Sequence, residues 1–198
     1  MIQIDLKTLD KSFTYSEFRT FVSEALANNI AALEIDESYL SYAQLNETRL
    51  NRLDKTLKVG EEAAAYLQQL KKDYLWLVIS ESWCGDAAQI VPMINKMAES
   101  SDRIDLKLVF RDKNLDLMDQ FLTNGGRAIP KLIIVDKETM QVVADWGPRP
   151  VLAQKLVEDY KAAHGTVDEQ GKIELQKWYT KDKGKEVESE IIALMKSI

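Results

Sequence analysis

The sequence predicts an α/β fold in which a central mixed sheet of about four strands is flanked by helices. Three observations support this class. An apolar run at residues 74–79 is typical of a buried strand, and residues 87–97 carry apolar side chains at helical spacing. A second strand pattern follows at 104–110. Residues 131–136 and 141–145 then give two strand patterns joined by a short polar turn, which predicts a hairpin.

Residues 1–59 are predicted to form a helical N-terminal extension. Residues 2–6 alternate apolar and polar side chains, which fits a short edge strand or an extended arm. Ser12 or Thr14 can cap a helix that runs to about residue 28. A second helix is expected over about 38–57.

The second of these helices carries an apolar stripe and a basic group. Its leucines recur at spacings of three to five residues and are expected to face the core: Leu45, Leu50, Leu53 and Leu57. The basic side chains lie mainly outside that stripe: Arg49, Arg52 and Lys55. For this group we favour a solvated helix face with local pairs to Glu47 and Asp54 over an anion-binding role.

Residues 60–163 hold the predicted core, and 164–198 form a helical C-terminal extension that we expect to pack with it as one compact unit. A helix over 61–72 leads into the first core strand. A helix over 115–123 should stop at the Asn-Gly-Gly sequence that follows it, because glycine accepts a positive φ. Further helices are expected at 151–163, 168–179 and 186–197.

Cys84 is the only cysteine, and it lies where the first core strand ends and the next helix begins. Unpaired backbone N–H groups and the positive end of a helix dipole favour the thiolate, which is the reactive form. The carboxylates of Glu81 and Asp86 oppose it. Three arginines in loops at the strand ends could approach the sulfur, although each taken alone is typical of a surface residue: Arg111, Arg127 and Arg149.

Four separated signals follow one another in the predicted core. They are the Trp-Cys-Gly-Asp-Ala motif at 83–87, Pro92 in the next helix, the Ile129–Pro130 pair and the Trp146–Gly147 pair. In this order they resemble the thioredoxin family, whose motif is Trp-Cys-Gly-Pro-Cys. The resemblance implies a thioredoxin-like fold, with Cys84 as the catalytic residue and Pro130 as a cis-proline facing it. It also implies the residues that shape the site: Trp83, Gly85, Asp86, Ala87, Ile129, Pro130, Trp146 and Gly147.

The sequence departs from this family where the family's chemistry is done. Ala87 replaces the second cysteine, Val78 replaces the buried aspartate, and Asp86 replaces the proline of the motif. With one sulfur, Cys84 cannot close an intramolecular disulfide, so dithiol disulfide reduction is not expected. An active Cys84 would exchange with the thiols and disulfides of proteins or peptides. Its thiolate would attack a disulfide to give a mixed disulfide, or would be oxidised to a sulfenic acid, and an external thiol such as glutathione would resolve the product.

Two further functions stay open at this point. The thioredoxin groove could serve as a non-catalytic module that binds a peptide or a partner protein, with the helical extensions adding surface. A cluster-binding monothiol protein similar to some glutaredoxins is a third hypothesis, but the sequence lacks the basic residue that family carries before its motif.

Composition excludes several classes of protein. The net charge is −6 and the basic residues are scattered among acidic ones, so we expect no nucleic-acid partner. No apolar run approaches the roughly 20 residues of a membrane span, and no secretory signal is recognisable, so we expect no membrane contact and a cytoplasmic location. The single histidine, His164, has no other ligands near it in sequence, and neither a metal nor a resident cofactor is expected.

Overall fold

The computed structural model describes residues 2–5 and 9–198, and a four-stranded mixed sheet lies at its centre. The strands are β1 (Tyr74–Ser80), β2 (Ile104–Phe110), β3 (Lys131–Asp136) and β4 (Gln141–Trp146), in the order β2-β1-β3-β4. β1 pairs parallel with β2 and antiparallel with β3, and β3 and β4 form a hairpin. The predicted α/β class and the mixed sheet are confirmed.

The two central strands, β1 and β3, are buried along their whole length. A strand with both faces covered has no solvated side, so it reads as a continuous apolar run and not as an alternating pattern. The two ends of β3 are exceptions, since Lys131 and Asp136 are charged and buried. The Lys131 ammonium group has hydrogen-bond partners in the Asp145 carboxylate, at 3.1 Å, and the Gly147 carbonyl, at 3.2 Å.

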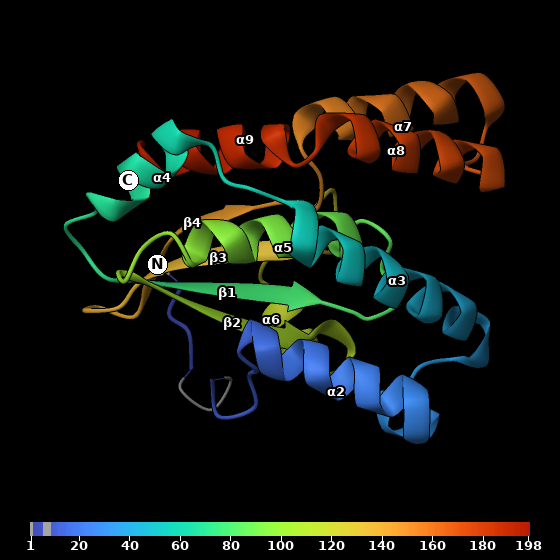
Figure 1. The fold of residues 1–198 in the computed structure, drawn as a ribbon, viewed down its shortest axis with the longest axis horizontal. Coiled ribbons are helices and arrows are strands. Elements are labelled where there is room, and N and C mark those ends of the chain that lie inside the picture. The colour runs from blue at the N-terminus through green and yellow to red at the C-terminus, as the bar shows by residue number, and fades with distance from the viewer. Residues whose placement is uncertain (1, 6–8) are drawn as a thin grey trace.

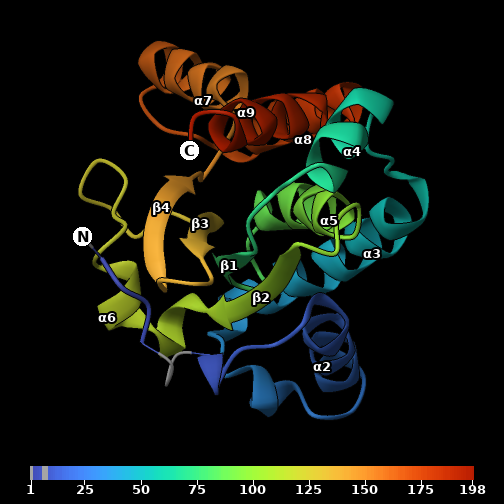
Figure 2. The same cartoon turned by 90° about the vertical axis from the view of Figure 1, so that its left-hand side faces the viewer.

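Helices cover the sheet, and further helices form the N-terminal and C-terminal parts of the chain. Their bounds are α2 (Tyr15–Asn28), α3 (Leu40–Thr56), α4 (Glu61–Gln68), α5 (Ala87–Ala98), α6 (Leu115–Met118), α7 (Val151–His164), α8 (Glu169–Asp182) and α9 (Lys185–Met195). Three short 3₁₀ turns are η1 (Ile30–Leu33), η2 (Glu37–Tyr39) and η3 (Arg111–Lys113). α5, which contains Pro92, packs against β1 and β2, and Figure 2 shows α6 on the other face of the sheet.

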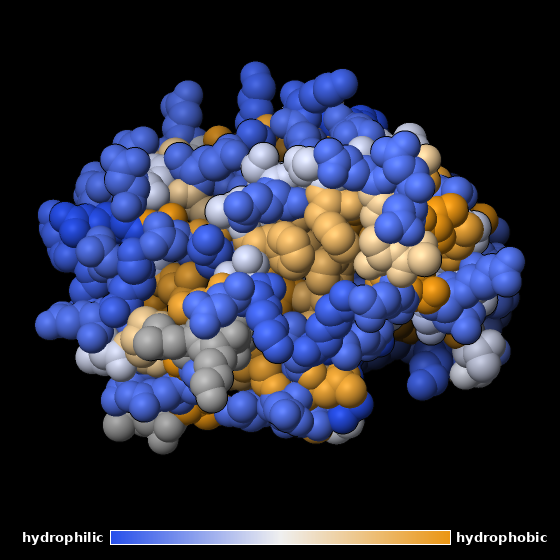
Figure 3. Space-filling model, turned by 90° about the horizontal axis from the view of Figure 1, so that it is seen from below, coloured by the Kyte–Doolittle hydropathy of each residue, from blue (hydrophilic) through white to orange (hydrophobic). Residues whose placement is uncertain are grey.

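The helices of the two chain extensions meet on the same core helix. α3 packs along one side of α5, and α9 contacts α5 and α4. Figure 1 shows α7, α8 and α9 gathered above the sheet, with α2 below it beside β2. None of the described helices is both long and apolar enough to cross a lipid bilayer. The face seen in Figure 3 carries an apolar area framed by hydrophilic side chains.

The first residues lie against the edge of the sheet. Gln3 forms an isolated antiparallel bridge with Gln141, at the start of β4. The expected strand of residues 2–6 is thus a short edge contact, and Leu6 lies outside the described residues. Thr14, and not Ser12, caps α2: its hydroxyl accepts the Glu17 N–H while the Glu17 carboxylate accepts the Thr14 N–H.

The helix expected over 115–123 is wrong in length, since α6 ends at Met118. Two contacts turn the chain there. Arg127 binds the Asp119 carboxylate through two N–H groups, and the backbones of Thr123 and Gly126 bond to each other. The helix expected over 61–72 likewise ends early, at Gln68.

The apolar stripe of α3 differs from the predicted one at its first position. Leu45 is 47% exposed, whereas Leu50, Leu53 and Leu57 are buried. The buried position in that turn is Asn46, because it continues the spacing of three and four residues that the other leucines set. Leu45, one position earlier, is rotated off the stripe.

Candidate functional site

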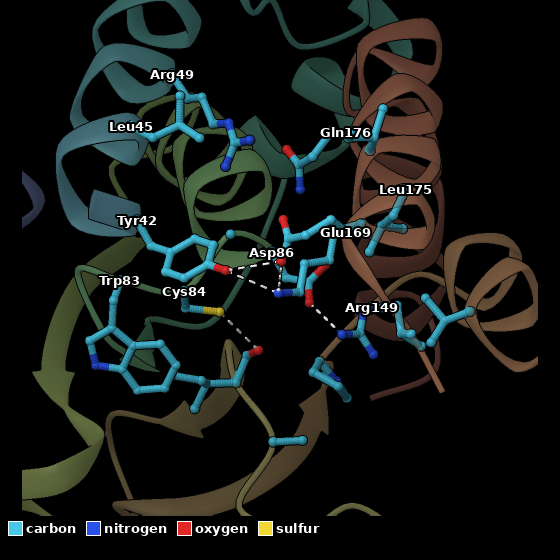
Figure 4. Close-up of a pocket in the computed structure, with 18 of the residues that line it drawn as sticks. Tyr42, Leu45, Arg49, Trp83, Cys84, Asp86, Arg149, Glu169, Leu175 and Gln176 are labelled. Carbon is cyan, nitrogen blue, oxygen red and sulfur yellow. Dashed lines mark hydrogen bonds and ion pairs between the residues drawn. The ribbon is translucent and has the colours of Figure 1, made fainter. Parts of the chain in front are cut away.

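A pocket of about 930 Å³ opens beside Cys84, between α3 and α8 (Figure 4). Its floor consists of loop residues at the ends of the strands: Trp83, Cys84, Gly85, Asp86, Ile129, Pro148 and Arg149. Its helical wall consists of the lining residues of α3 and α8, among them Tyr42, Leu45, Arg49, Lys172, Leu175 and Gln176. The volume lies within the range of roughly 300–1,000 Å³ that small-molecule sites occupy.

Cys84 lies in the floor three residues before α5, and its side chain is only 7% exposed. The thiol donates to the Ile129 carbonyl oxygen at 3.4 Å, and the Ala87 N–H donates to the sulfur at 3.4 Å. Burial, followed by the charge of Asp86, raises the pKa of the Cys84 thiol to about 12. The N–H groups at the start of the helix and the charge of Arg149 lower the pKa of Cys84 but do not offset the burial. The helix start therefore does not produce a thiolate here at neutral pH.

Asp86 occupies the motif position of the family's proline, and it holds a buried ion pair. Its carboxylate lies 2.6 Å from Nη2 of Arg149 and accepts the Tyr179 hydroxyl at 2.8 Å. Burial opposes the charge of Arg149, but the carboxylate of Asp86 raises the pKa of Arg149 above its ordinary value. Arg149 is thus the arginine that approaches the sulfur, and Asp86 neutralises it. Because Tyr179 belongs to α8, the same contacts join the floor to the helical wall.

A second carboxyl group next to the floor is also held away from water. Glu81 is buried and accepts the Asp112 N–H at 2.9 Å. Burial raises the pKa of Glu81 to about 7. The turn after β1 thus contains an acid that is partly protonated near neutral pH and a thiol that is fully protonated.

Two prolines and a glycine lie in or next to the loops that form the floor. The peptide bonds before Pro130 and before Pro148 are both cis. Gly147 has a φ of +112°, and a Cβ atom there would lie 2.4 Å from the Pro130 carbonyl oxygen. Only glycine fits this position, since its neighbour is backbone and cannot move aside.

Trp83 and Trp146 are both expected to shape the site, and of the two the structure places only Trp83 on the pocket lining, where it forms an aromatic rim. Tyr39 stacks on the Trp83 indole with ring centroids 4.5 Å apart, and the Arg111 guanidinium lies 4.8 Å from the Trp83 ring. Trp146 turns away because its indole N–H donates to Glu190 in α9 at 2.8 Å. The rim is therefore built from Trp83 and Tyr39.

The helical wall is held together by side chains from the two extensions. Tyr42 in α3 donates its hydroxyl proton to Glu169 in α8 at 3.2 Å, and Lys172 donates to the Tyr42 oxygen at 3.0 Å. Gln176 accepts the side-chain N–H of Gln89 in α5 at 2.8 Å. α8 is thus fixed to both α3 and α5.

Arg49 is the member of the expected basic group that enters the pocket. Its Nη1 donates to Oδ1 of Asn46 at 2.9 Å, and Asn46, which is 1% exposed, donates to the Ser82 carbonyl at 3.0 Å. Burial and the nearby Arg52 lower the pKa of Arg49. The predicted solvated face is wrong for this residue.

The local acid partners predicted for the basic group are taken by another helix. Glu47 and Asp54 bind Arg19 of α2, at 3.0 Å and 2.5 Å. Arg49 forms no ion pair within the part of the chain that the structure describes. One feature of the sequence could have indicated that Arg49 is held in the pocket. It is Asn46, a polar residue at the position where the leucine stripe requires a buried side chain.

Sequence reasoning missed the residues that the two extensions contribute to the pocket and to its support. Tyr39, Tyr42, Gln176 and Tyr179 lie in the two extensions, about 40 residues before and 90 residues after Cys84 in the printed sequence. No local pattern links them to the motif. Within residues 2–5 and 9–198, no group of three or more His, Cys, Asp and Glu side chains is arranged to hold a metal ion.

Comparisons with known proteins agree with this architecture. The family model described as thioredoxin matches residues 32–161. A crystal structure of a protein of unknown function from Pseudomonas aeruginosa is 16% identical, with a TM-score of 0.59 over 93% of this chain and 98% of that one. An HIV epitope-scaffold protein is 15% identical, with a TM-score of 0.61 over 98% of both chains. At these identities the two structures show the shared fold alone. No curated protein sequence matches the chain.

Proposed function

Since the chain belongs to the thioredoxin family, we propose that it uses the family's fold without the family's dithiol chemistry, as a protein that binds a ligand non-covalently in the pocket beside Cys84. The observation that carries this proposal is the state of the sulfur. Cys84 is buried and protonated, and it lines a pocket large enough for a ligand. A thiol is a poor nucleophile compared with its thiolate, so the floor supports binding better than exchange.

The lining of the pocket supports the same function. Ligand sites combine apolar and aromatic walls with a few placed polar groups. Here Trp83, Ile129 and Leu175 supply apolar surface, and Arg49 and Gln176 supply polar donors. The ligand would be a compact molecule or a short peptide segment, because α3 and α8 bound the space on two sides.

The test is the pH dependence of alkylation of Cys84 by iodoacetamide, a small uncharged reagent. We expect the rate to keep rising above pH 9, because burial raises the pKa of the thiol to about 12. Asp86→Asn is the matched control: it removes the charge that raises the pKa of Cys84, so its profile should move to lower pH. A wild-type rate that reaches its plateau at or below pH 7 would contradict the proposal.

Monothiol exchange is the second candidate, and the position of Cys84 on the pocket lining favours it. The Cys84 thiolate would attack one sulfur of a disulfide, releasing the other as a thiolate. An external thiol such as glutathione would then attack the mixed disulfide and regenerate Cys84. Mass spectrometry after exposure to oxidised glutathione at pH 7 separates the two functions. A stoichiometric adduct on Cys84 within minutes favours exchange, and an unmodified protein favours binding.

A further inference from the structure

The pocket differs in charge from the molecule as a whole. The chain carries 26 basic and 32 acidic side chains, whereas the lining carries seven basic and two acidic ones. Four of the seven have acidic partners within 4.0 Å: Arg111, Arg127, Arg149 and Lys172. Three of them, among the described residues, form no ion pair: Arg49, Lys177 and Lys181.

Of these three, Arg49 is the one that the structure holds in place. Lys177 and Lys181 are exposed on α8, but Arg49 is half-buried. Asn46, itself anchored to the Ser82 carbonyl, fixes one end of the guanidinium. Burial, followed by the charge of the nearby Arg52, lowers the pKa of Arg49, so an anion beside its guanidinium would be stabilised by a charge that no carboxylate of the described chain neutralises.

Gln176 provides a second donor at the same place. Its Oε1 is occupied by Gln89, so its amide Nε2 is directed to the pocket. Both Nε2 of Gln176 and Nη1 of Arg49 lie over Gly85, at 3.5 Å and 3.6 Å from the position a Cβ atom would take there. Figure 4 shows the two side chains pointing toward one another from α8 and α3.

Apolar surface adjoins this pair of donors. Leu45 is one helical turn before Arg49 on α3, and it is 47% exposed. Leu175 and Trp83 line the same pocket from α8 and from the floor. A ligand that satisfied both features would need an anionic head group and an apolar body.

We infer that the pocket binds a carboxylate carried on an apolar body, with the carboxylate on Arg49 and Gln176 and the body against Leu45, Trp83 and Leu175. This inference rests on the proposed binding function. A carboxylate is assigned because the planar guanidinium fork donates two parallel hydrogen bonds to it, and the amide of Gln176 adds a third. The carboxylate can belong to a small organic acid or to the apolar C-terminal residue of a peptide.

Calorimetric titration with matched compounds tests the inference. The probes are 4-phenylbutyrate and the tripeptide Ala-Ala-Phe, each compared with its own amide at pH 7. We expect at least one acid to bind about tenfold more tightly than its amide, because hydrogen bonds to a charged group contribute more than neutral ones. The acid that shows the preference identifies the source of the carboxylate.

Variants of α3 assign the effect to Arg49. Arg49→Gln should abolish the preference for acid over amide, because the acid loses more affinity than the amide when the charge is removed. Arg49→Lys keeps the charge but loses the fork, so it should retain only part of the preference. Arg52→Gln is the matched control, since Arg52 lies on the same helix and outside the pocket lining, and it should retain the whole preference.

Four results would overturn the inference: equal binding of acid and amide by the wild type, a preference that survives in Arg49→Gln, a phosphonate of the same body that binds more tightly than the carboxylate, or no binding of any probe. Equal binding of acid and amide leaves the proposed function standing, because the pocket then takes up the apolar body alone. If no probe binds, the inference is overturned. The proposed function is tested separately, by the pH dependence of Cys84 alkylation.

Discussion

The floor and the helical wall of the pocket differ in whether their charged side chains are neutralised by a partner. In the floor, Asp86 neutralises Arg149 and burial keeps Cys84 protonated, so the family's reactive turn carries no free charge. In the wall, Arg49 carries a charge that no acid of the described chain neutralises. The turn that carries the family's motif thus holds a paired arginine and a protonated thiol. The extensions, which lie outside that motif, supply the free charge.

The largest expected effect concerns the rigidity of the floor. Gly147→Ala should lower the free energy of unfolding by roughly 2–5 kcal/mol, because the residue has a positive φ and its Cβ would meet the Pro130 carbonyl. Gly171→Ala is the counterpart in α8, where the Cβ would meet the Tyr160 ring at 2.7 Å. A side chain can turn aside, so that variant should lose only about 1 kcal/mol. Urea unfolding measures both, and equal losses would remove the distinction between a rigid floor and an adaptable wall.

A somewhat smaller effect is expected where the floor and the wall are joined. Asp86→Ala should cost about 3 kcal/mol, since it leaves Arg149 without its counter-ion and the Tyr179 hydroxyl without an acceptor. Tyr179→Phe removes only the hydroxyl contact and should cost about 1 kcal/mol. Chemical denaturation of the two variants measures the difference. If Asp86→Ala cost no more than Tyr179→Phe, the ion pair would not hold the floor together.

The smallest effect is a pH dependence from the acid beside the floor. Burial raises the pKa of Glu81 to about 7 from an ordinary value of 4.5, so between these pH values the folded chain keeps a proton that the unfolded chain releases. Stability contributed by this group therefore falls as the pH rises through that window. Glu81→Gln should remove the fall and raise the free energy of unfolding at pH 8 by on the order of 2 kcal/mol.

Glu81→Gln keeps the hydrogen bond to Asp112, which controls for the loss of that contact. A glutamine oxygen can still accept the Asp112 N–H, so the variant changes the charge and not the hydrogen bond. Unfolding by urea at pH 5 and pH 8 gives the slope for both proteins. An unchanged slope in the variant would place the titrating group elsewhere.

The elements that could be predicted share one property: their evidence is local. The apolar runs of β1 and β3 and the helical spacing of α5 describe the burial of each segment by itself. Two errors at the site arose where a distant contact decided the outcome. Arg19 of α2 takes the acids expected to pair within α3. The hydrogen bond from Trp146 to Glu190 of α9 holds an indole that was expected to shape the site, and Trp146 does not line the pocket.

By itself, the sequence determined the fold class, the family and the location of the single thiol after β1, because hydrophobic periodicity and a short motif carry that information. Only the tertiary structure decided whether the thiol is charged and which cation stays free. The pKa of Cys84 depends on how completely α3, α8 and the Ile129 loop exclude water, and the freedom of Arg49 depends on Arg19 occupying its neighbours. The pKa of Cys84 and the pairing of Arg49 both depend on contributions from segments far apart in the chain. Burial and electrostatic energy depend on distance in space and not on distance in sequence.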